Sequence, residues 1–76
     1  MDTVAQELRL ARECERRAAA CRPDSGNLAL YRESARKHRD RAAALASGDG
    51  FQWDEAGRFV AYGFVLQRTP DGIRIE

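Results

Sequence analysis

The chain has 76 residues, of which 43% are apolar and 33% are charged, and its net charge is only +1. Once the thirteen alanines, Met1 and the two cysteines are set aside, seventeen large apolar side chains remain, enough for one small core. Two cysteines and one histidine are too few for a four-ligand metal cage or a disulfide framework. The balanced charge provides no overall field that would draw the chain onto nucleic acid or anionic lipid.

The sequence contains no signal for a membrane or for secretion. No stretch approaches 18 consecutive apolar residues, so we expect no membrane-spanning segment and no membrane partner. Met1–Val4 lacks the basic and apolar regions of a secretory signal. We therefore expect a cytoplasmic protein whose cysteines stay reduced.

A first helix is predicted over residues 3–21. Asp2 or Thr3 provides an N-cap, and Pro23 ends the helix because the residue before a proline avoids the helical region. Small or apolar side chains recur with the four-three-four spacing of one helical face, at Val4, Leu8, Ala11, Cys14, Ala18 and Cys21.

A second helix is predicted over residues 25–47. Its stripe alternates steps of three and four residues, at Leu28, Tyr31, Ala35, His38, Ala42 and Leu45. So short a turn between two long helices predicts an antiparallel hairpin. Because the facing seams are built mostly from alanine and cysteine, they bury little apolar area, and the hairpin needs a further hydrophobic cover.

Aromatic and β-branched residues dominate after Gly50, which favours strands. Turn signals divide this part into three short strands, at about 51–53, 58–69 and 73–76, connected as an antiparallel meander over residues 51–76. Gly63 marks a bulge or a close backbone contact in the middle strand. Together these elements predict a single α+β domain over residues 1–76, an antiparallel helical hairpin packed on a three-stranded antiparallel sheet. The middle strand is apolar on both faces, so we expect leftover apolar surface and a homodimer or a protein partner.

The cysteines and the histidine are interpreted as structural residues. Cys14 and Cys21 lie about 10 Å apart along one helix, too far for a disulfide between them. Burial as small hydrophobic residues is favoured over an intermolecular disulfide, and metal binding with His38 is disfavoured by the spacing. No sequence signal places a nucleophile or an orienting carboxylate beside His38, so we expect no catalytic role for it.

No catalytic or cofactor-binding motif is present, so we expect neither an enzyme nor a cofactor.

Residues 24–47 carry a net charge of +2 and residues 48–76 a net charge of −2. The basic side chains of the second helix are interpreted as spread around its polar arc rather than gathered on one line, with Glu33 and Lys37 as an ion pair. Because tryptophan and arginine most often anchor interfaces, we predict a partner-binding surface. Its residues are Arg32, Arg36, Lys37, Arg39, Arg41, Trp53, Asp54 and Glu55.

The chain is small, compact and rich in alanine and arginine. It has the helical pair Val4–Cys21 and Leu28–Leu45 and an aromatic segment after Phe51. In these features it resembles accessory proteins of phages and mobile elements. In style it is similar to anti-CRISPR proteins. That resemblance implies a cofactor-free inhibitor in the bacterial host that occludes a CRISPR effector complex by steric or electrostatic blocking. The alternative is a nucleic-acid-binding or transcription-regulating protein that uses the basic face of the second helix.

Overall fold

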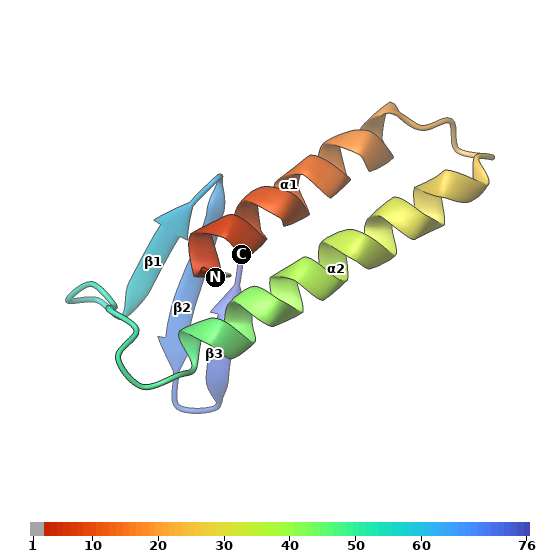
Figure 1. Cartoon of the computed structure of the whole chain (residues 1–76). Helices are drawn as coiled ribbons and strands as arrows, with labels where there is room; N and C mark the ends of the chain where they lie inside the picture. The colour runs from red at the N-terminus through yellow and green to blue at the C-terminus, as the bar shows by residue number, and fades with distance from the viewer. Residues whose placement is uncertain (1–2) are drawn as a thin grey trace.

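A computed structural model describes residues 3–76 as two helices followed by a three-stranded antiparallel sheet (Figure 1). The α+β architecture is therefore as predicted. The helices pack against each other as one layer, and the sheet lies against one face of that layer. Neither helix in the described range has an apolar stretch that would cross a bilayer. The elements are α1 (Val4–Ala20), α2 (Gly26–Ala46), β1 (Arg58–Ala61), β2 (Phe64–Thr69) and β3 (Gly72–Ile75).

Both helices begin where local capping chemistry places them. The Thr3 hydroxyl accepts a hydrogen bond from the Gln6 amide at 3.1 Å, and the Ser25 hydroxyl accepts one from the Asn27 amide at 3.2 Å. Each bond satisfies an amide that has no partner within its helix. The two predicted helices are thus confirmed to within a residue at each end. Asp2, the other predicted cap, lies outside the described residues.

The predicted strand boundaries are wrong in two places. Residues 51–53 form no strand, and the predicted long strand 58–69 is two strands, β1 and β2, joined by a hairpin at Tyr62 and Gly63. Both turn residues have positive φ, 52° and 81°, as in the primed turns that match strand twist. A Cβ at position 63 would also lie 2.9 Å from the Arg12 guanidinium, so a larger residue there would displace this side chain.

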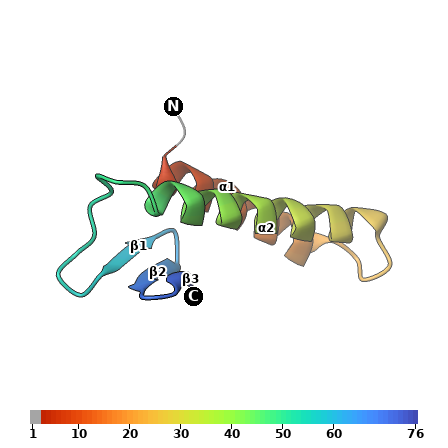
Figure 2. The same cartoon turned by 90° about the horizontal axis from the view of Figure 1, so that it is seen from below.

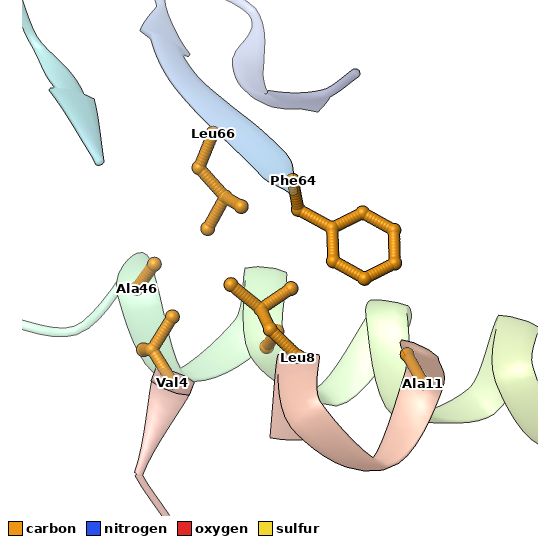
Figure 3. Packing of buried hydrophobic residues seen from close by; sticks show 7 residues of the cluster. Val4, Leu8, Ala11, Ala46, Phe64 and Leu66 are labelled. Carbon is orange, nitrogen blue, oxygen red and sulfur yellow. The ribbon is translucent and has the colours of Figure 1, made fainter. Parts of the chain in front are cut away.

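The core lies where β2 meets the helices (Figure 3). Leu66 and Phe64 point from β2 toward Leu8 and the alanines of both helices, and Leu66 and Leu8 are completely buried. The alanines let the two helices approach closely, while the sheet supplies the large side chains that the hairpin lacks. The segment before β1 closes one side of this core through an edge-to-face aromatic cluster of Phe51, Trp53 and Phe59.

The sheet covers only one end of the hairpin. It packs against the start of α1 and the end of α2, while the other half of the helical pair projects beyond it (Figure 2). The resulting shape is elongated, 43 × 24 × 20 Å. The projecting half therefore exposes the continuation of the helical face that the sheet buries at the other end.

Candidate binding surface on the projecting helices

A groove runs between α1 and α2 along their projecting half. It has a volume of about 700 Å³. Alanines of both helices and charged side chains line it together. The lining residues are Glu15, Ala18, Ala19, Ala29, Arg32, Glu33, Ala35, Arg36 and Arg39.

Three arginines of α2 line this groove together. Arg32, Arg36 and Arg39 are separated by four and three residues, so they lie on one helical face. The interpretation that the basic residues are spread around the helix is therefore wrong for these three. It holds for Lys37 and Arg41, which are exposed but do not line the groove.

The three arginines differ in how far acidic neighbours neutralise them. Arg36 donates hydrogen bonds to both carboxylate oxygens of Glu33, and an Asp40 oxygen lies 3.9 Å from it. Arg39 pairs with Glu15 at 2.7 Å across the two helices. Arg32 has no ion pair among residues 3–76 and is exposed. It is the groove cation that is free to bind an external carboxylate.

The Glu33 pairing also departs from the sequence-based prediction. Glu33 pairs with Arg36 rather than with Lys37. The hydrogen bond from Arg36 holds the pKa of the Glu33 carboxyl below its usual value. Desolvation opposes this effect, and the charges of Arg36 and Lys37 add to it. A lowered folded-state pKa means that the pair stabilises the protein above the ordinary glutamate pKa and is lost as the pH falls through the lowered value. Glu33 therefore stays ionised, and Arg36 stays partly neutralised, at neutral pH.

A charged network joins the groove to the sheet. Arg12 donates to the Tyr62 carbonyl at 2.9 Å, stacks 4.1 Å above the Phe64 ring centre and also pairs with Glu15. Glu15 in turn holds Arg39. These contacts fix the hairpin turn of the sheet under α1 and orient the inner end of the groove.

A second hollow, of about 440 Å³, adjoins the groove at this network. It shares Glu15 and Arg39 with the groove, and at the sheet it reaches the end of β3 at Ile75 and Glu76. The two hollows are thus neighbours, and the Glu15–Arg39 pair lies between them.

The remaining predicted site residues lie elsewhere. Trp53 packs against Phe51 and lines a hollow with Ala46 at the end of α2 and with Thr69 and Gly72 of the sheet. Asp54 organises the turn before β1, because its carboxylate accepts hydrogen bonds from the Ala56 and Arg58 amides. Glu55 is exposed in that turn. The structure therefore does not bring these three residues together with the arginines of α2.

A buried Glu7–His38 pair was missed by sequence reasoning. Oε2 of Glu7 lies 2.6 Å from Nδ1 of His38, and the Glu7 side chain is only 1% exposed. The signal was present, because Glu7 falls within the apolar stripe between Val4 and Ala11. A carboxylate that orients an imidazole occurs in hydrolases, but no nucleophile is hydrogen-bonded to His38 within residues 3–76. The pair instead connects the two helices.

Cys14 and Cys21 are both free thiols and half-buried. Over residues 3–76, no three side chains of the types that ligate metals come together. No protein family, curated protein or solved structure matches the chain. The resemblance to anti-CRISPR proteins therefore stays a prediction.

Proposed function

We propose that the protein is a binding module that acts by contact rather than by catalysis and that its groove holds an acidic segment of a partner protein. The arginine row of Arg32, Arg36 and Arg39 beside the alanines of the groove carries this proposal. The small side chains permit close approach of a partner backbone, and the arginines are well suited to recognise carboxylates.

Charge favours a protein over a nucleic acid as the occupant. Three arginines and two glutamates line the groove, so its net charge is only +1. Binding to a nucleic-acid backbone depends on several unneutralised cations that release counterions from phosphates. Here Arg36 and Arg39 already have carboxylate partners within the chain. Arg32 can bind a carboxylate of the partner segment directly, whereas Arg36 and Arg39 would exchange their present carboxylates for those of the segment.

Reversing the charge of Arg32 tests the proposal. The probe is a capped, fluorescently labelled peptide that alternates threonine with glutamate. Arg32→Glu should weaken the binding of this peptide by roughly fivefold to tenfold, because a repulsion replaces an attraction at an exposed site. The measurement is the Kd from fluorescence anisotropy, with circular dichroism as the check of folding.

Arg41→Glu is the matched control, since it makes the same charge change on the same helix outside the groove. We expect its Kd to stay close to that of the unmodified protein. Equal losses for both variants would reduce the effect to general electrostatics and contradict a specific groove. Tighter, steeply salt-dependent binding of duplex DNA in the same assay would favour the nucleic-acid alternative.

The identity of the partner and the oligomeric state stay predictions. For a CRISPR effector complex, expression of the protein should restore plating of a phage that the host's CRISPR system targets, and Arg32→Glu should abolish this.

For a homodimer, the outer face of the sheet offers the apolar surface, where Val60 is 64% exposed beside Val65. Light scattering at micromolar concentration tests it, and a monomer would contradict it.

A further inference from the structure

The edge of β3 presents backbone groups without partners. Val65 and Glu76 exchange two hydrogen bonds, of 2.8 and 2.9 Å, which sets the phase of the β2–β3 ladder. In an antiparallel ladder, hydrogen-bonded residue pairs alternate with non-bonded pairs. Ile75 and Ile73 therefore stand at non-bonded positions opposite Leu66 and Arg68, and their amides and carbonyls point away from β2. Within residues 3–76 these groups have no hydrogen-bond partner.

The opposite edge of the sheet is partly protected. On β1, the outward amide of Arg58 donates to the Asp54 carboxylate, and its carbonyl accepts from the Asp54 amide at 3.1 Å. Natural sheets usually cover or interrupt an edge in this way, because an open edge is a template for pairing. No comparable turn covers β3, so β3 is the edge that is ready to accept another strand.

The open edge also faces the underside of the projecting helices (Figure 2). The helices are about 25 and 31 Å long, whereas three strands span only about 10 Å between the outer strand axes. The second hollow lies at this junction, with Ile75 and Glu76 on the sheet side and Arg39 on the helix side. One more strand beside β3 would therefore lie next to this second hollow, which shares Glu15 and Arg39 with the groove.

We propose that an extended segment of the partner protein adds to β3 as a fourth strand and directs one row of its side chains toward the arginines of α2. This inference rests on the proposed function and specifies the conformation of the acidic segment. Alternate side chains of the added strand point toward the helices. Arg39, at the junction, meets the first of them, and Arg36 and Arg32 lie farther along the groove.

A second copy of the chain fits this edge poorly. Antiparallel pairing of two β3 strands places a twofold axis perpendicular to the joined sheet, so that both helical hairpins lie on the same side. Each hairpin projects past β3 toward the other copy, and the two would compete for the same space (Figure 2). A single extended segment without a helical layer of its own avoids this collision.

Hydrogen exchange measured by NMR tests the added strand. The probe is the capped peptide that alternates threonine with glutamate, and the same peptide with lysine in place of glutamate is the control. In the free protein, the Ile73 and Ile75 amides should exchange rapidly. With saturating acidic peptide, we expect their exchange to slow by about tenfold or more, because they now donate to the added strand.

A matched pair of variants separates the backbone contact from the side chain. Ile75→Pro and Ile75→Ala both remove the isoleucine side chain, but only proline removes the outward amide, which an edge strand tolerates. We expect the proline variant to bind the acidic peptide about fivefold more weakly than the alanine variant, the loss of about one hydrogen bond. Retained amide shifts throughout the rest of the chain show that both variants are folded.

The outcomes distinguish the two proposals. Peptide binding that shifts the Arg32 and Arg36 signals without protecting Ile73 and Ile75 would overturn the added strand and leave the groove intact. Equal affinities of the proline and alanine variants would also overturn the added strand. Absence of binding to the acidic peptide would overturn the proposed function itself. Equal binding of the lysine peptide would overturn the role of the arginines.

Discussion

Leu66→Ala is expected to lower the free energy of unfolding by about 3 kcal/mol. Leu66 is completely buried on the central strand, where it contacts both helices through the core cluster (Figure 3). Truncation loses the transfer free energy of the side chain and leaves a cavity that the rigid helical pair cannot fill. A chain of this length has a total stability of only about 4–11 kcal/mol, so the loss is a large fraction of it.

Urea denaturation followed by circular dichroism measures this loss. The matched control is Val60→Ala, which removes apolar atoms from the same sheet at a site that is 64% exposed. We expect the control to change the stability by less than about 0.5 kcal/mol. Similar losses for both variants would contradict the placement of the core between β2 and the helices.

His38→Ala is expected to cost about 2–3 kcal/mol of stability, although His38 itself is only partly buried. The reason is Glu7, whose carboxylate would remain buried without the imidazole that now bonds to it at 2.6 Å. Removing His38 leaves a buried carboxyl group without its hydrogen-bond partner. The value lies at the lower end of the usual range because His38 is 22% exposed and water can partly replace it.

The double variant Glu7→Leu with His38→Ala provides the control. It removes the buried carboxyl group together with its partner, so we expect most of the lost stability to return. Thermal and urea denaturation of the two single variants and the double variant form a thermodynamic cycle. Additive losses would show that the two side chains act independently and would contradict the pair as a stabilising link between the helices.

The helices could be predicted closely because their signals are local. A cap, an apolar stripe and a proline each act within one or two turns, so Thr3, Ser25 and Pro23 place the helix ends with little help from the rest of the chain. The antiparallel order followed in the same way from composition and turn residues, but two of the three predicted strands were wrong, since 51–53 forms none and 58–69 is divided. The break at Tyr62 could not be predicted, because a bulky residue at positive φ is unfavourable by itself. The hairpin and the Arg12 bond to its carbonyl hold it there.

For the candidate surface too, the local features could be predicted from the sequence and the long-range contacts could not. The arginines could be named from the sequence, since their spacing on α2 is a local property. Their partners could not, because Glu15, which holds Arg39, lies on the other helix and 24 residues away. Trp53 was grouped with the arginines because tryptophan often lies in interfaces. In the structure it packs against Phe51 and the hydrophobic core, away from the projecting half of the helices.

The sequence by itself determined two capped helices, a strand-rich end and the need of each half for the other, because these depend on neighbouring residues and on the amount of apolar surface. Only the tertiary structure decided that the sheet covers one end of the helical pair, that Glu7 meets His38 and that the end of β3 shares a hollow with Arg39. These features depend on the relative placement of segments that are distant in the chain, and that placement is set by packing rather than by local preference.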